Sequence, residues 1–170
     1  MAFQEIAIES LVCNPFTKIS KEWMLITAGD EERSNTMTAS WGGRGIMWGK
    51  NIATVYIRPQ RYTKEFVDAN GTFTISFLSE EYRKALNVCG TVSGKDVEDK
   101  WQEAGLHPYP VDGTAAVAEA DLVLVCKTQY HQEMKPECFD VAENDEKWYP
   151  QKDYHIMYMA EIVKVLKKSE

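Results

Sequence analysis

The sequence predicts a mainly β protein, a small antiparallel barrel decorated by short helices. About six segments are apolar runs or alternate apolar with polar residues, which is typical of strands. These segments do not alternate regularly with long helices, so a doubly wound parallel sheet is disfavoured. Closure into a barrel also removes exposed sheet edges. A length of 170 residues suits one domain with a sizeable core, and we expect a single domain over residues 1–170.

The predicted strands differ in how their two faces are buried. WMLITA is a continuous apolar run, which indicates a buried strand, and the charged turn GDEERS joins it to the alternating NTMTASW. IATVYI is rich in β-branched and aromatic residues and is closely followed by Pro59. TFTISF alternates hydroxyls with large apolar residues. The predicted strands are 23–28, 35–41, 52–57, 72–77, 121–130 and 155–166.

Three short helices are expected between these strands, over residues 62–70, 79–90 and 96–105. The first ends at Asn70-Gly71, a favourable C-terminal stop. The second places Tyr82, Ala85, Leu86 and Cys89 on one face, at the spacing of an amphipathic helix. The third has Asp96 as its expected N-cap.

An acidic segment, KPECFDVAENDEKWYPQKDY, separates the last two strands. Its length suggests that it packs on another surface, for example on a second subunit. Its residues show no recognisable motif, and its role cannot be assigned from sequence.

Composition excludes several classes of function. Hydrophobic residues make up 44% of the chain and charged residues 26%, as in ordinary globular proteins. A net charge of -7 argues against a nucleic-acid binder and against an anionic membrane surface as partner. No signal peptide and no membrane-spanning run is recognisable, so we expect a cytoplasmic protein. The four cysteines are widely spaced and the three histidines stand alone, so no metal site is predicted.

One stretch, SNTMTASWGGRGIMWGK, combines hydroxyls, tryptophans and glycines. Thr36, Thr38 and Ser40 fall on one face of an extended strand and lead into a glycine-rich turn beside Trp41 and Trp48. This arrangement suits a polar, partly flat ligand. The alternative is the solvent face of a half-exposed strand, with ordinary core or interface aromatics.

The glycine-rich turn satisfies neither familiar phosphate motif. For GxGxxG beginning at Gly43 the third glycine falls on Trp48, and for GxxxxGK the first glycine falls on Arg44. The strand-to-helix context that both motifs need is also missing. A dinucleotide-binding Rossmann site and a P-loop are therefore rejected.

The segment RPQRYTKEF is the better candidate for an anion site. It follows a strand and opens a helix near Thr63, where free N–H groups and the helix dipole favour an anion. Arg58 and Arg61 would add charge-assisted hydrogen bonds. The alternative is that both arginines pair with surface carboxylates and Thr63 only caps the helix.

Taken together and in this order, these stretches resemble a known family. WMLITAGDEERSNTMTASWGGRGIMWGK, VYIRPQRYTKEF, FTISFLSEEYRKALNVCGTVSGKDVEDK and EAGL are similar to the flavin reductase-like, FMN-binding split-barrel proteins, and most of all to their flavoredoxin-like branch. The resemblance is good over about residues 11–130 and resumes in HIMYMAEIVKV. It implies a six-stranded antiparallel Greek-key split barrel that forms a homodimer, with FMN at the dimer interface.

The resemblance also implies a set of site residues. Main-chain groups and hydroxyls of one strand and turn would contact the flavin ring and ribityl chain, and the RPQRYT segment would hold the phosphate. His155 matches a histidine at the start of the family's last strand and is the candidate on the nicotinamide side. The implied cofactor-binding residues are Asn35, Thr36, Met37, Thr38, Ala39, Ser40, Trp41, Lys50, Arg58, Gln60, Arg61, Tyr62 and Thr63.

The implied chemistry belongs to the cofactor, with a nicotinamide dinucleotide, NADH or NADPH, passing hydride to flavin N5. Two functions remain open: an NAD(P)H-dependent flavin reductase, and an FMN-loaded electron carrier that turns over little nicotinamide. A redox protein is a possible partner of either. A split barrel acting on pyridoxamine phosphate is a weaker alternative. The sequence distinguishes neither the nicotinamide donor nor the final electron acceptor, nor whether FMN is a tight prosthetic group.

Overall fold

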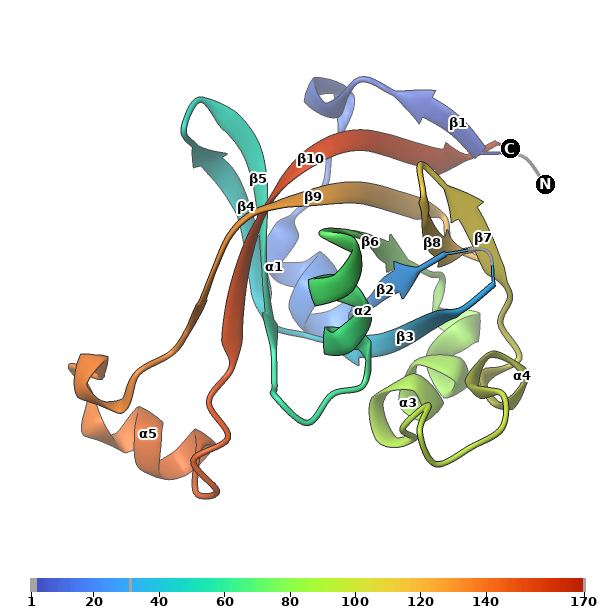
Figure 1. The fold of residues 1–170 in the computed structure, drawn as a ribbon. Coiled ribbons are helices and arrows are strands. Elements are labelled where there is room, and N and C mark those ends of the chain that lie inside the picture. Colours follow the sequence, from blue (N-terminus) through green and yellow to red (C-terminus); the bar gives the residue numbers. More distant parts are fainter. Residues whose placement is uncertain (1–2, 31, 170) are drawn as a thin grey trace.

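The computed structural model describes residues 3–30 and 32–169. Most of it is antiparallel sheet, with short helices outside (Figure 1). The strands are β1 Phe3–Ile6, β2 Met24–Gly29, β3 Ser34–Ala39, β4 Gly42–Met47, β5 Lys50–Ile57, β6 Thr72–Phe77, β7 Pro108–Val111, β8 Thr114–Val117, β9 Leu122–Glu133 and β10 Ile156–Lys168. The helices are α1 Pro15–Thr17, α2 Thr63–Asn70, α3 Arg83–Thr91, α4 Lys100–Ala104 and α5 Ala142–Trp148, with further helical turns at Ile8–Ser10, Lys18–Glu22, Glu80–Tyr82 and Pro136–Cys138.

The main sheet has eight strands in the order β3-β2-β6-β9-β10-β5-β4, with β1 also paired to β10. Strand β10 organises this arrangement. One of its edges pairs with β9, whereas its other edge pairs with β5 through Ile156–Glu161 and with β1 through residues 165–168. Strands β7 and β8 form a separate hairpin. Among the described residues, the pairing does not close into a ring, because β3 and β4 each have one strand neighbour.

Two apolar cores lie on opposite faces of this sheet. Neighbouring residues of β2 divide between them, as expected for a strand buried on both sides: Leu25 packs in one core and Ile26 in the other. The first core fills the sheet's concave interior and includes Phe73 and Tyr158. The second lies under α3, α4 and the β7–β8 hairpin and includes Leu86.

The mainly β antiparallel class is confirmed, but the six-strand count is not. The six predicted strands are present with boundaries shifted by a few residues, and β1 and β4 extend the same sheet. Strand β4 occupies GGRGIM, which the sequence indicated as a turn because glycine is depleted in strands. Here glycine is required: a Cβ on Gly42 would lie 2.7 Å from the carbonyl oxygen of Thr54 on β5.

The helix predictions are correct in two cases and wrong at one boundary. Helix α2 ends at Gly71, whose φ of 65° permits the left-handed cap. Helix α3 buries Ala85, Leu86 and Cys89 as predicted. Asp96 is not an N-cap; α4 begins at Lys100, because the Asp99 carboxylate accepts the first free backbone N–H groups of that helix.

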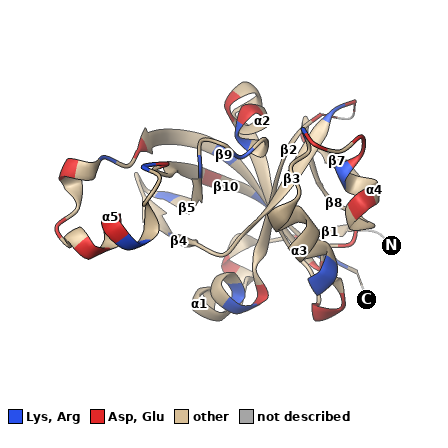
Figure 2. Cartoon of the chain, turned by 90° about the horizontal axis from the view of Figure 1, so that it is seen from below, with Lys and Arg blue, Asp and Glu red and all other residues tan. Residues whose placement is uncertain are grey.

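The long ends of β9 and β10 project from the rest of the sheet and carry the acidic segment between them (Figure 1). We call residues 134–154, between these strands, the arm. Acidic residues cluster along it, as Figure 2 shows at α5. No helix of the described residues is long and apolar enough to cross a membrane.

Candidate functional site

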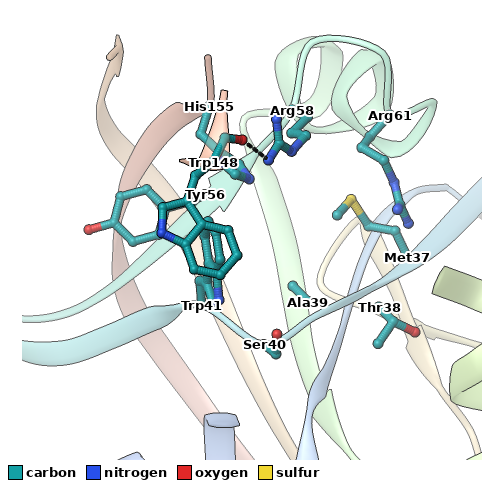
Figure 3. Close-up of a pocket in the computed structure, with 10 residues that line it drawn as sticks. All are labelled: Met37, Thr38, Ala39, Ser40, Trp41, Tyr56, Arg58, Arg61, Trp148 and His155. Atoms are coloured by element: carbon teal, nitrogen blue, oxygen red, sulfur yellow. Dashed lines mark hydrogen bonds between the residues drawn. The ribbon is translucent and has the colours of Figure 1, made fainter. Parts of the chain in front are cut away.

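A groove opens where the end of β3, the end of β5, the arm and the start of β10 meet (Figure 3). Its volume is about 270 Å³. Basic, aromatic and small side chains all contribute to its walls. The groove is lined by Met37, Thr38, Ala39, Ser40, Trp41, Tyr56, Arg58, Arg61, Trp148 and His155.

Two arginines define one end of the groove. Arg61 donates from Nη1 to the carbonyl of Gly90 at 3.0 Å and from Nη2 to that of Cys89 at 3.1 Å, both near the C-terminal end of α3. A cation is favourable there because the helix dipole and free carbonyls are negative. Burial lowers the pKa of Arg61 from its usual value. The guanidinium carries more N–H groups than these bonds use, so donors remain for an anion.

Arg58 is held by the arm instead. Its Nη2 donates to the carbonyl of Trp148 at 2.9 Å, and its Nη1 lies 2.8 Å from Oδ2 of Asp153. The guanidinium also lies over the ring of Tyr149, 5.0 Å from the centroid. The arm therefore fixes the position of Arg58 and neutralises its charge.

The part of the groove beyond Arg58 is aromatic, and we call it the aromatic end. The rings of Trp41 and Trp148 meet edge to face with centroids 5.0 Å apart, and Trp41 lies 5.3 Å from the ring of His155. Tyr56 lies edge-on to His155 at 6.4 Å. Trp41 and Trp148 are 40% and 41% exposed, so part of each ring is accessible to a ligand.

His155 is buried, and its Nδ1 lies 2.7 Å from the hydroxyl of Tyr149. Burial lowers the pKa of His155 from 6.5 to about 4, and the nearby Arg58 acts in the same direction. The imidazole is therefore neutral at neutral pH. It can hydrogen-bond a ligand without adding charge to the aromatic end of the groove.

Behind the arginine end lies a buried lysine, at a position where a solvated helix lysine would be the ordinary expectation. Lys100 is 6% exposed and donates to the Cys89 carbonyl at 3.1 Å. Burial lowers the pKa of Lys100 to about 8. Burial also raises the pKa of the Cys89 thiol to about 11, so this cysteine is an inert core residue.

The structure brings together many of the residues that the sequence predicted. The groove includes Met37, Thr38, Ala39, Ser40, Trp41, Arg58, Arg61 and His155 from that set. The hydroxyl of Thr38 is less available to a ligand than its strand position suggests, because it donates to the Leu86 carbonyl of α3 at 2.5 Å.

The remaining predicted residues lie outside the groove lining. Thr36 is buried against Thr27, with hydroxyl oxygens 2.8 Å apart. Asn35 donates to the hydroxyl of Thr63 at 2.8 Å, which ties β3 to the start of α2. Because Thr63 is fully buried, its hydroxyl is committed to this bond.

Three further predicted residues serve other contacts. Lys50 pairs with Glu161 at 2.6 Å. Lys50 lies at the start of β5 and Arg58 directly follows its end, so the two residues are about 26 Å apart at the usual rise of a strand. Gln60 donates to Oδ2 of Asp153 at 2.7 Å. Tyr62 packs against Phe66 and accepts a hydrogen bond from Arg33.

Sequence reasoning missed the groove residues Tyr56 and Trp148. Tyr56 alternates with the buried Val55 and Ile57, so its strand position alone indicated that it faces away from them. Nothing in the arm's sequence indicated that Trp148 would reach the end of β3.

The chain matches the model of the flavin reductase like domain over residues 16–170, and it therefore belongs to this family. The family prediction is confirmed. No curated protein sequence matches the chain significantly.

Solved structures with the same fold include an FMN-binding domain of a flavin reductases-like enzyme from Shewanella baltica, at 16% identity and a TM-score of 0.68, with 98% of this chain and 77% of that chain covered. Flavoredoxin of Desulfovibrio vulgaris (Miyazaki F) is 24% identical with a TM-score of 0.67, covering 86% of this chain and 69% of that chain. An NADH:FAD oxidoreductase from Streptomyces globisporus is 13% identical with a TM-score of 0.64, covering 86% and 76%. At these identities the likeness establishes the fold.

Proposed function

We propose that this protein is an FMN-binding oxidoreductase that takes hydride from NADH or NADPH. The observation that carries the proposal is the groove itself, which combines two guanidinium groups with an adjoining aromatic wall. FMN has the matching chemistry, a phosphate and a flat ring system joined by a hydroxylated chain. Family membership and the names of the similar structures support the same ligand.

The residues present suit this cofactor. Arg61 and Arg58 would bind the phosphate with the N–H groups that their present bonds leave free. The backbone at the end of β3 and the hydroxyl of Ser40 would contact the ribityl chain and the ring edge. Trp41 and Trp148 would border the ring system.

The protein's own part in the reaction is to bind, orient and exclude water. When bound, FMN supplies the redox chemistry by accepting hydride at its N5. His155, neutral and fixed by Tyr149, would form an uncharged surface for the nicotinamide. No side chain has to act as nucleophile or base in this proposal.

We further propose that the groove is completed in a homodimer. A volume of about 270 Å³ is below the usual range of ligand pockets, roughly 300–1,000 Å³. The half-exposed Trp41 and Trp148 beside it favour cover by a second copy. Sedimentation velocity tests this: we expect a dimer, and a monomer at all concentrations with FMN bound would contradict it.

The first experiment is an absorbance spectrum of the purified protein, followed by anaerobic addition of NADH and then NADPH. We expect flavin bands near ~450 nm that bleach within seconds, and the faster nicotinamide identifies the donor. The variant Arg58→Ala/Arg61→Ala is the control, because it should lose the bands after desalting.

Two other outcomes are informative. Flavin bands that persist with both nicotinamides would favour the alternative of an FMN-loaded electron carrier, reduced by another redox protein. The flavoredoxin among the similar structures supports that alternative. A protein that neither carries nor binds FMN would contradict the proposal altogether.

A further inference from the structure

The arm places a carboxylate on the arginine end of the groove. Oδ2 of Asp153 lies 2.8 Å from Nη1 of Arg58 and accepts a second hydrogen bond from Gln60 at 2.7 Å. These hydrogen bonds, that of Gln60 first, lower the pKa of Asp153, so the group is ionised at neutral pH. A fixed negative charge therefore faces one of the two cations of the groove.

This carboxylate makes the two arginines unequal. Arg61 donates only to neutral carbonyls, so its full positive charge is directed to the groove. Arg58 shares its charge with Asp153, and an incoming phosphate has to compete with that carboxylate for the guanidinium. Carboxylate and phosphate bind a guanidinium in the same way, through charge-assisted N–H bonds.

We propose that Asp153 is a specificity-determining residue, which weakens the preference of the groove for a phosphorylated flavin over riboflavin. The inference rests on the proposed function, because it assumes that Arg58 faces the flavin phosphate. Riboflavin has the same ring and ribityl chain but no phosphate. Asp153 therefore lowers the affinity for FMN and leaves that for riboflavin almost unchanged.

Another acidic residue of the arm provides a matched control. Asp145 accepts hydrogen bonds from Tyr154 at 2.7 Å and from Lys152, all within the arm. Its role is internal, since neither of these partners lines the groove. Asp145→Asn removes one negative charge of the arm, and it substitutes none of the groups that contact Arg58.

The test is to measure the dissociation constants of FMN and riboflavin by fluorescence titration, for the wild type, Asp153→Asn, Asp153→Ser and Asp145→Asn. The quantity compared is the ratio of the riboflavin constant to the FMN constant, in which general changes of the arm cancel. We expect this ratio to rise about five- to tenfold in both Asp153 variants and to stay unchanged in Asp145→Asn. Using two substitutions keeps the test valid if one of them fails to fold.

Failure of the inference is distinguishable from failure of the proposed function. An unchanged ratio in the Asp153 variants, with both flavins bound, overturns the inference alone. An equal rise in Asp145→Asn also overturns it, because the effect would then come from net charge. Failure of the wild type to bind either flavin overturns the proposed function and this inference with it.

Discussion

Arg58 and Arg61 are only three residues apart in sequence, yet different parts of the molecule hold them. Arg61 bonds to carbonyl groups of α3, within the body of the protein. Arg58 bonds to the arm, through the Trp148 carbonyl and the Asp153 carboxylate. The comparison teaches that one cation of the site is built into the fold, whereas the other depends on a segment that projects from it.

The largest expected effect comes from removing both arginines. Arg58→Ala/Arg61→Ala should weaken FMN binding by about 2–4 kcal/mol, because charge-assisted bonds to the phosphate are lost. Fluorescence titration measures this, and riboflavin affinity together with circular dichroism shows whether the groove is still folded. An unchanged FMN affinity would mean that the phosphate lies elsewhere.

The single variants should separate the two arginines by stability. Arg61→Ala should lower the free energy of unfolding by about 2 kcal/mol, because the Gly90 carbonyl loses its donor and a half-buried side chain is removed. Arg58→Ala should cost less, about 1 kcal/mol or below, because its partners lie on the arm, which projects from the body of the protein (Figure 1). Urea unfolding measures both. Equal losses of unfolding free energy in the two variants would contradict the view that Arg61 is held by the body of the protein more firmly than Arg58 is held by the arm.

The pH dependence tests the junction of the arm with β10. The pKa of His155 is lowered to about 4 in the folded protein from 6.5 in the unfolded chain, so the unfolded state binds more protons between these values. The stability from neutral His155 is complete above pH 6.5 and is lost as the pH falls toward 4. Between pH 7 and pH 5 the wild type should lose about 2 kcal/mol more than His155→Gln. Identical pH profiles of the two proteins in urea unfolding would show that folding does not lower the pKa of His155.

The smallest expected effect concerns the contact between the arm and β3. Trp148→Ala removes the edge-to-face contact with Trp41 and should lower stability by about 1 kcal/mol. The backbone carbonyl that binds Arg58 remains, so the arginine end should keep its geometry. Val141→Ala, at an exposed position of the arm, is the control and should stay within about 0.5 kcal/mol of the wild type. If both variants lose equally little of the free energy of unfolding, the arm is not anchored through Trp148.

Local patterns predicted most of the strands and failed where tertiary contact overrides propensity. TFTISF has the alternation and β-branched content of a strand, and β6 spans that segment. GGRGIM has neither, and β4 forms there because Gly42 allows a close approach to Thr54. Asp99 caps α4 in place of the predicted Asp96, because both are acidic residues ahead of the same helix and residue type alone does not separate them.

The site was predictable where its residues are neighbours in sequence. Ser40, Trp41, Arg58 and Arg61 belong to two short stretches whose residue types suggested a ligand, and all four line the groove. The hydroxyl row was less informative, because α3 covers the face that carries Thr38. Trp148 and Asp153 could not be predicted, because their contacts to Arg58 span 90 residues or more and follow no periodicity.

That separation along the chain has a consequence for the order of folding. The β2–β3 hairpin joins residues close in sequence, so it can form early, whereas β5 meets β10 across roughly a hundred residues at a large cost in loop-closure entropy. The pairing of Ile57 with Ile156 brings Arg58 within reach of the arm. The groove is therefore completed late in folding, and its arm-side wall is where we expect local opening to begin, before the sheet itself unfolds.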